Sequence, residues 1–523
     1  VGRHEYSTVI VPPSLTLRSN TVKLLCEFAK VAGPDKIIFI GKIPDRVDGI
    51  LDQSWVPEGV KVVNTIDEAI NIVDAYYPER IRVTDKKTGK NAEKVLLHSR
   101  IDGENRIVFA ANTDEKNDAH VTITFPGTKI PYVLDLMNAK IYRPKADICE
   151  GKTRINLTFM PAGSVAFCFT DEDLGDNPVP EMLDMGAEFD ANSDEGYNYL
   201  SYGEKSICTF DVEPLEENVL PLNYADLYLD GKPVALNTHL SAIWHDHFYK
   251  APDGTPFKAV YRFMVHEVPE GDITAVIEVA ENLDSVKING VKVNPLKTRG
   301  EEIRFDPQKC WKDVSFTKVP IGGNVVKGIN TIEIEGIKVN NITGPNNHSR
   351  VKNFKDHIPT EVETVYIIGN FSVVNENNKS FAITKFEKPN VSGNVTISGM
   401  PFYAGRISLK TVINVQKPDS KRVYLRLNNV HAASVSLKVN GKYSDVKYWR
   451  PYLFDITDLV KNGENTIEII AATTLFNLMG PNWIENVLDI TFLRPTTFIN
   501  KDSFTDRLIL LPFGVESATV IVS

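Results

Sequence analysis

The stretch Gly463-Glu464-Asn465-Thr466-Ile467-Glu468-Ile469 decides the fold, because the chain contains it twice in nearly the same form. The other copy is Gly328-Ile329-Asn330-Thr331-Ile332-Glu333-Ile334. Each copy is preceded by an Asn-Gly pair and a tryptophan and is followed by Gly-Pro-Asn. These landmarks are Asn289-Gly290, Trp311 and Gly344–Asn346 around the copy at 328–334, and Asn440-Gly441, Trp449 and Gly480–Asn482 around the copy at 463–469. Four landmarks in one order predict two copies of one β-sandwich module.

The repeated residues have a structural meaning. Asn-Gly is the preferred pair for a type I′ hairpin turn, since both central residues need positive φ. In Gly-x-Asn, glycine supplies a left-handed residue and asparagine can bond nearby backbone. The alternating Thr-Ile-Glu-Ile that follows is typical of a strand with one buried face. The repeat therefore predicts turns and strand starts, and it supplies no chemistry of its own.

Working outward, the periodicity changes along the chain. It alternates strand and helix up to about residue 85 and then has a period of two almost throughout. We therefore predict a multidomain, mainly β protein. The expected parts are a small, partial α/β domain of the flavodoxin or Rossmann type over 1–85, a small antiparallel β-sandwich over 86–170, a linker over 171–196, and two galactose-binding-like jelly rolls over 197–395 and 396–523.

Composition excludes several function classes. The net charge of −10 is spread along the 523 residues without a basic cluster, so we expect no nucleic-acid partner. No apolar run approaches the roughly 20 residues of a spanning helix, so we expect no membrane partner. The α/β unit has neither GxGxxG nor GxxxxGK[ST], which argues against a nucleotide cofactor.

The cysteines and the first residue bear on compartment and completeness. The chain has five scattered cysteines without CxxC spacing: Cys26, Cys149, Cys168, Cys208 and Cys310. They predict neither a disulfide framework nor a zinc site. They favour a reducing, cytoplasmic compartment, although secretion stays open. Val1 is not an initiator methionine, and a strand is expected within a few residues of it. We therefore expect a piece of a longer protein.

Several segments resemble known enzymes in order along the chain. The Asn-Gly pair, the run Phe454-Asp455-Ile456-Thr457-Asp458-Leu459 and the repeated Gly-x-Asn-Thr-Ile resemble the galactose-binding-like jelly rolls of large glycoside hydrolases, such as the family 2 β-galactosidase type. Tyr6–Leu17 with Ile40–Pro44 is similar to the segment just after the catalytic barrel in α-L-rhamnosidase-like enzymes of glycoside hydrolase family 106. Later landmarks of that family are matched by Val365–Phe371, Gly399–Gly405 and Thr474–Pro481.

The resemblance implies an accessory role. In that family the catalytic carboxylates lie on an upstream (β/α)₈ barrel, and this chain has no eightfold βα pattern, so no catalytic residue is carried over. The first hypothesis is the C-terminal accessory region of a glycosidase that acts on plant or bacterial polysaccharide, with the barrel elsewhere in the same precursor. The alternatives are a free-standing carbohydrate-binding or adhesin-like protein, and a complete enzyme whose site is not recognisable.

Six residues are candidates for ligand contact. Trp244-His245-Asp246-His247 is a dense polar-aromatic cluster, and on a strand His245 and His247 would point the same way toward a metal or a sugar. Trp449 and Trp483 lie beside turn residues and could stack on a pyranose, although Trp311 in the other copy favours packing for Trp449. Sandwich turns can hold structural calcium, but no run matches a DxDxDG loop, so metal binding stays open.

Overall fold

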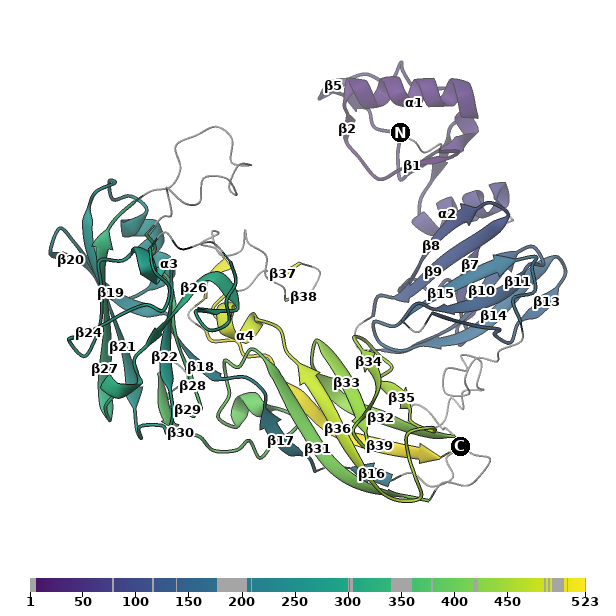
Figure 1. The fold of residues 1–523 in the computed structure, drawn as a ribbon. Helices are drawn as coiled ribbons and strands as arrows, with labels where there is room; N and C mark the ends of the chain where they lie inside the picture. Colours follow the sequence, from purple (N-terminus) through teal and green to yellow (C-terminus); the bar gives the residue numbers. More distant parts are fainter. Residues whose placement is uncertain are drawn as a thin grey trace. The chain divides into compact units, whose positions relative to one another are not determined.

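The computed structural model describes residues 6–77, 80–114, 117–137, 139–175, 205–207, 209–299, 301, 304–339, 360–377, 380–416, 422–483, 486–487, 490–491, 503–505 and 507–522. Three features named from the sequence lie outside these residues: Gly344–Asn346, Cys208 and most of the 171–196 linker. The chain divides into two compact units, Val1–Asp194 and Glu195–Ser523. The predicted fold class is confirmed, since the structure is multidomain and mainly β (Figure 1).

The first unit begins with a three-layer α/β domain. Its parallel sheet has the order β1 (Val9–Val11), β3 (Ile37–Ile40), β6 (Lys61–Val63). Helix α1 (Ser19–Ala32) packs on one face and α2 (Ile66–Tyr76) on the other, so β3 is buried on both sides, as its unbroken apolar run predicts. Shorter elements complete this domain: β2 (Thr16–Leu17), η1 (Pro34–Lys36), β4 (Arg46–Val47) and β5 (Ile50–Leu51).

A small β-sandwich follows in the same unit. One sheet has the order β13 (Asp147–Cys149), β14 (Lys152–Phe159), β10 (Ala119–Pro126), β7 (Arg82–Asp85), and the other β12 (Lys140–Tyr142), β11 (Ile130–Asp135), β15 (Ser164–Thr170), β9 (Asn105–Asn112), β8 (Val95–Asp102). The rings of Phe125 and Phe169, 4.0 Å apart between centroids, join the two layers. Because β7 pairs with β10, the sandwich includes residues that fall inside the 1–85 range expected for the α/β domain.

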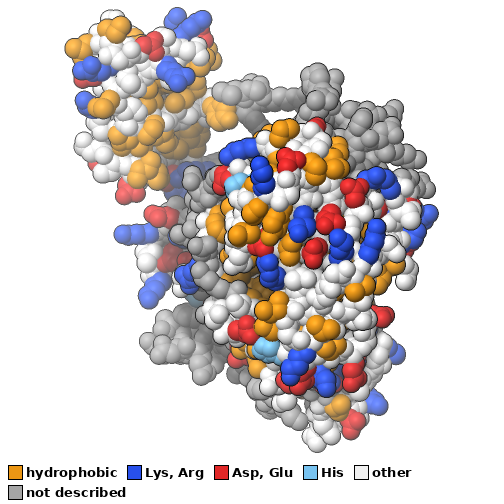
Figure 2. All heavy atoms as spheres, turned by 90° about the vertical axis from the view of Figure 1, so that its left-hand side faces the viewer, with side chains coloured by type: hydrophobic (Ala, Val, Ile, Leu, Met, Phe, Trp, Pro, Cys, Tyr) orange, Lys and Arg blue, Asp and Glu red, His pale blue; other side chains and the backbone are white. Residues whose placement is uncertain are grey.

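The second unit contains two sandwiches. The first consists of a five-stranded sheet packed on an eight-stranded sheet. The five-stranded sheet has the order β18 (Asn218–Leu222), β28 (Val365–Gly369), β22 (Ile273–Glu278), β26 (Asp313–Pro320), β25 (Cys310–Trp311). The eight-stranded sheet has the order β20 (Lys232–His239), β19 (Tyr224–Leu229), β21 (Pro256–Val265), β27 (Gly328–Ile337), β23 (Ser285–Ile288), β24 (Val291–Val293), and it also includes β29 (Phe371–Asn375) and β30 (Phe381–Lys385). Figure 2 shows basic, acidic and hydrophobic side chains intermingled on the side of the molecule that it presents. Between the neighbouring strands β23 and β27, Lys287 lies 3.0 Å from Glu335.

The second sandwich is built in the same way. Its sheets are β16 (Lys205–Ile207), β39 (Gly514–Val522), β32 (Val423–His431), β35 (Leu453–Asp455) and β17 (Asp211–Pro214), β31 (Arg406–Val415), β36 (Gly463–Ala472), β33 (Ser434–Val439), β34 (Lys442–Lys447). The short elements of the unit are α3 (Leu240–Ala242), η3 (Ile243–Phe248), η4 (Ala280–Asn282), η5 (Gly322–Asn324), η6 (Val395–Ile397), α4 (Phe476–Met479), β37 (Asn486–Val487) and β38 (Ile490–Thr491).

The chain order of the two sandwiches differs from the simple succession expected. Strands β16 and β17 lie within 197–395, yet they pair with β39 and β31 of the second sandwich. The first sandwich is thus inserted between β17 and β31. Where the chain returns, Glu216 accepts hydrogen bonds from the backbone N–H and the Nε of Arg406 and from the Tyr403 hydroxyl. Short strands that precede an insertion carry no sequence signal of which sheet they will join.

The repeated motif makes one hydrogen-bond network in both sandwiches. Asn330 and Asn465 are fully buried, and each accepts a 2.8 Å bond from the amide of the turn asparagine, Asn289 or Asn440. These turn asparagines have φ of 49° and 52°, as a type I′ turn requires. Each also accepts a bond from the backbone N–H of the threonine that follows the buried asparagine. The network ties the hairpin to the start of a ten-residue strand, β27 or β36.

Candidate functional site

Three aromatic side chains form an exposed surface at one edge of the second sandwich. Tyr443, Tyr448 and Trp449, here called the 443–449 surface, are 59%, 49% and 53% exposed. The rings of Tyr448 and Trp449 lie 6.1 Å apart at 39°. Partial burial raises the pKa of Tyr443, and so do the nearby Asp445 carboxylate and the Tyr448 hydroxyl. Tyr448 and Trp449 thus lie side by side, and Tyr443 stands on the strand that leads to them.

The hairpin geometry places this surface outside the core. Strand β34 is the edge strand of its sheet, and it follows the Asn440-Gly441 turn. On β34, Lys447 bonds Asp445 at 2.6 Å and places its ammonium 5.8 Å from the Phe454 ring. Phe454 is buried in the core of this sandwich, whereas the three residues of the 443–449 surface are not among its core residues. Exposed aromatic side chains gathered at one place are typical of a binding surface.

The two equivalent tryptophans have different environments. Trp311 is 8% exposed and packs on Tyr366 with ring centroids 5.5 Å apart. Its likeness to Trp311 in the repeat favoured a packing role for Trp449. That prediction is wrong, because Trp449 lies in the loop after β34 and is 53% exposed. The tyrosines that accompany it were missed from the sequence. Their signal was present, since an Asn-Gly turn followed by three aromatic residues within ten positions occurs in the second copy and not in the first.

Trp483 is a core residue. It is 6% exposed, and its ring contacts that of Phe504 at 5.6 Å. Phe504 in turn lies 4.5 Å from the ring of His239 at the end of β20, which belongs to the first sandwich. Trp483 thus helps pack the C-terminal segment against the first sandwich, and its indole offers no open face to a sugar.

The 244–247 cluster lies on a helical turn, and the expected strand is wrong. Residues Leu240–Ala242 form α3 and Ile243–Phe248 form η3, a π-helix. Ile243 and Phe248 are buried in the core, whereas Asp246 between them is exposed and the other three residues are half-buried. Residues two apart on a helix do not face each other, so His245 and His247 cannot act as a strand pair. Within the described residues no group of three potential ligands could hold a metal ion.

In the first sandwich, the charge of one carboxylate raises the pKa of another. Burial raises the pKa of Glu278, at the end of β22. Burial, and then the charge of Glu278, raises the pKa of Glu361 to about 7. Glu361 precedes β28, which pairs with β22, so the sheet brings together groups that are far apart in sequence. A carboxyl that keeps its proton near neutral pH can act as a general acid, but nothing about these residues was visible in the sequence.

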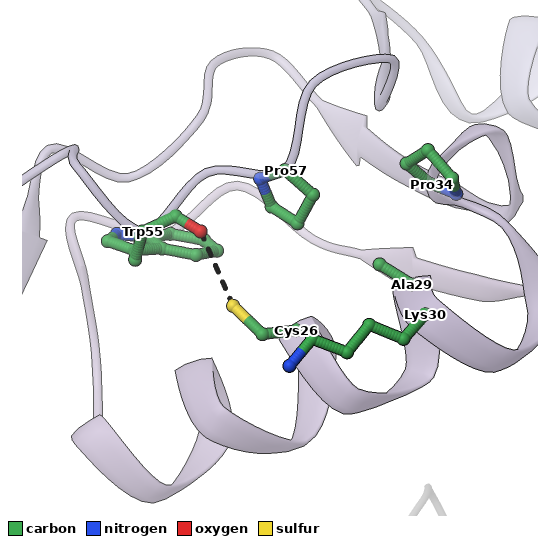
Figure 3. A pocket seen from close by; sticks show the side chains of 6 residues that line it. All are labelled: Cys26, Ala29, Lys30, Pro34, Trp55 and Pro57. Atoms are coloured by element: carbon green, nitrogen blue, oxygen red, sulfur yellow. Dashed lines mark hydrogen bonds between the residues drawn. The ribbon is translucent and has the colours of Figure 1, made fainter.

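A shallow hollow lies in the α/β domain of the first unit (Figure 3). It has a volume of about 320 Å³ and is lined by Cys26, Ala29, Lys30, Pro34, Trp55 and Pro57. The Cys26 thiol donates to the Trp55 carbonyl at 3.3 Å, which joins α1 to the facing loop. The lining contains no carboxylate or imidazole, so it cannot provide a carboxylate pair for glycoside hydrolysis.

Comparison with known proteins finds likeness at low identity. No family model and no curated protein matches the sequence. Among solved structures, a rhamnosidase from Novosphingobium sp. PP1Y is 12% identical over 96% of this chain and 33% of its own, with a TM-score of 0.36. A β-D-mannosidase from Dictyoglomus thermophilum is 12% identical over 51% of this chain and 32% of its own, with a TM-score of 0.20.

A third example is a β-glucuronidase from Bifidobacterium dentium, 14% identical over 30% of this chain and 29% of its own, with a TM-score of 0.19. All three of these proteins are glycoside hydrolases, and this chain spans about a third of the length of each. Within the described residues no helix is long and apolar enough to cross a membrane.

Proposed function

We propose that this chain is an accessory, carbohydrate-binding region of an α-L-rhamnosidase-like glycoside hydrolase that acts on plant or bacterial polysaccharide. The observation that carries the proposal is the 443–449 surface, three exposed aromatic side chains at a β-sandwich edge that lie outside the core of that sandwich. The ordered resemblance of the flanking segments to family 106 enzymes supports the enzyme class. In this proposal the catalytic carboxylates belong to a barrel elsewhere in the precursor, and this chain holds the polymer near it.

The chemistry of the surface suits a pyranose. One face of a pyranose ring is largely C–H, and it can pack on an indole or phenol ring while its hydroxyls remain at the rim. The same segment carries the Tyr443 and Tyr448 hydroxyls and the Lys447–Asp445 ion pair, which can donate and accept hydrogen bonds. Such a contact is small, so we expect affinities per site in the range of about 10 μM to 1 mM.

Affinity electrophoresis tests the proposal. The chain should be retarded in gels that contain a rhamnose- or galactose-containing polysaccharide, and Trp449→Ala should weaken binding by about tenfold, the loss of one stacked ring worth about 1.5 kcal/mol. Phe305→Ala is the matched control, since Phe305 is a 47% exposed aromatic residue of the other sandwich. Absence of retardation on all such polysaccharides would contradict the proposal.

The 443–449 surface also fits the alternative of a free-standing carbohydrate-binding or adhesin-like protein. The two functions differ in what surrounds the chain, so the coding sequence upstream of Val1 separates them: a barrel domain in the same reading frame supports the accessory role. Turnover of nitrophenyl glycosides by this chain alone would instead favour a complete enzyme and overturn both readings.

A further inference from the structure

A second aromatic pair lies on the first sandwich, at the helical turn between β20 and β21. The ring centroids of Trp244 and Tyr249 are 5.1 Å apart, and the two ring planes are tilted by 33°. Tyr249 is 60% exposed, while Trp244 is partly covered. The pair therefore presents an exposed phenol ring in contact with a half-buried indole.

The π-helix produces this stacking. The Tyr249 N–H donates to the Trp244 carbonyl at 2.9 Å, a bond between residues five apart. That spacing places side chains at i and i+5 above one another, where an ordinary α-helix aligns i with i+4. Single π-turns of this kind are rare and frequent at functional sites. At the other end, His239 Nδ1 accepts from the Ser241 N–H at 3.2 Å and caps the turn.

A buried lysine holds the pair in place. Lys338, at the end of β27, is 1% exposed and donates to the carbonyl groups of Tyr249, at 3.1 Å, and of Ala251. Its ammonium also lies 5.4 Å from the Phe248 ring. Burial of an ammonium group is costly unless its donors are paired. The Lys338 ammonium is paired with these carbonyl groups, and it thereby fixes the backbone at Tyr249.

The polar groups beside the pair include one matched ion pair and one histidine. Asp246 lies 3.7 Å from Lys250 and is balanced by it. The ring of His245 stands edge-on to Trp244 at 4.8 Å, and its buried Nε2 has no hydrogen-bond partner in the part of the chain that the structure describes. An unsatisfied polar atom in such a place is normally met by a water or a ligand group.

We propose that Trp244 and Tyr249 form a second binding surface for a neutral pyranose, so that each chain has two sugar sites. The inference rests on the proposed carbohydrate-binding function and adds to it the class of ligand, a neutral polymer long enough to engage two sites. The sites are not related by the repeat, since one follows an Asn-Gly hairpin and the other lies on a helical turn. Two weak sites on one chain favour a polymer over a short oligosaccharide through effective concentration.

Titration calorimetry of the full chain tests the proposal with tetrasaccharide fractions of a β-galactan and of a rhamnan. The expected stoichiometry is two for the unaltered chain and for Phe305→Ala, one for Trp449→Ala, one for Tyr249→Ala, and none for the double variant. On the intact polysaccharide in gels, each single variant should lose at least tenfold in affinity. Tyr249→Leu, which keeps the apolar bulk without the aromatic ring, should match Tyr249→Ala and guards against a folding defect.

The outcomes separate the two proposals. One site per chain that is lost in Trp449→Ala and unaffected in Tyr249→Leu overturns the second site and leaves the proposed function standing. One site that is lost in Tyr249→Leu and unaffected by Trp449→Ala supports the second site and removes the 443–449 surface from the proposed function. No heat with either fraction and no retardation on the polymers overturns both.

Discussion

The buried asparagine of the repeated motif allows a quantitative prediction for Asn465→Ala. The Asn465 amide donates to the carbonyls of Lys461 and Gly463 at 2.8 and 2.9 Å. Its carbonyl accepts from the Lys461 N–H at 2.9 Å and from Asn440 at 2.8 Å. Removing it breaks four hydrogen bonds at a site that is 1% exposed. At about 1 kcal/mol for each, the second sandwich should lose about 4 kcal/mol of unfolding free energy.

The isosteric variant Asn465→Asp sharpens the test. A carboxylate has the same shape but cannot donate to the two carbonyls, so it should destabilise at least as much as alanine at neutral pH. Asn414→Ala is the control, because Asn414 is exposed on β31 of the same sandwich and should change the free energy by less than about 0.5 kcal/mol.

The assay must separate the sandwiches, since a multidomain chain does not unfold in one step. Hydrogen–deuterium exchange of the β36 and β27 amides reports the two sandwiches independently. Asn465→Ala should speed exchange in β36, and Asn330→Ala should do the same in β27. A loss below about 1 kcal/mol in both would refute the reasoning that these networks hold the hairpins to β27 and β36.

Three further predictions concern single sites. Burial opposes the ionisation of Glu216, but hydrogen bonds from Arg406 outweigh this effect and lower the pKa of Glu216. The ionised carboxylate therefore stabilises the fold at neutral pH, and this stabilisation is lost in acid. Glu216→Gln should flatten the acid side of a curve of Tm against pH. Burial, and secondly a neighbouring carboxylate, raise the pKa of Glu361 from 4.5 to about 7. The protonated carboxyl is the stabilising form, so Tm should decline as the pH rises from about 4.5 to about 7 and the proton is lost. Glu361→Gln should remove this decline. Gly514 has a φ of 147° and its added Cβ would collide with a backbone carbonyl, so Gly514→Ala should lower Tm by at least about 4 °C, whereas Gly323→Ala, with open space, should not.

The sequence predicted most reliably what local chemistry dictates. The positive φ of Asn289 and Asn440, the strand after each Gly-x-Asn and the double burial of β3 follow from residue types and their spacing. The strand expected for His245 failed because a short polar-aromatic run has no clear period. There the burial of Ile243 and Phe248, five residues apart, determined a helical turn.

By itself, then, the sequence determined that this protein contains two related sandwiches, because turn residues and alternation act over a few positions and repeat visibly. Only the tertiary structure decided that β16 and β17 join the second sandwich, since β16 pairs with a strand some 300 residues away and β17 with one some 200 residues away. It also decided that Trp311 is core while Trp449 is exposed. Identical residues at equivalent places diverge because exposure depends on what the rest of the chain packs against them.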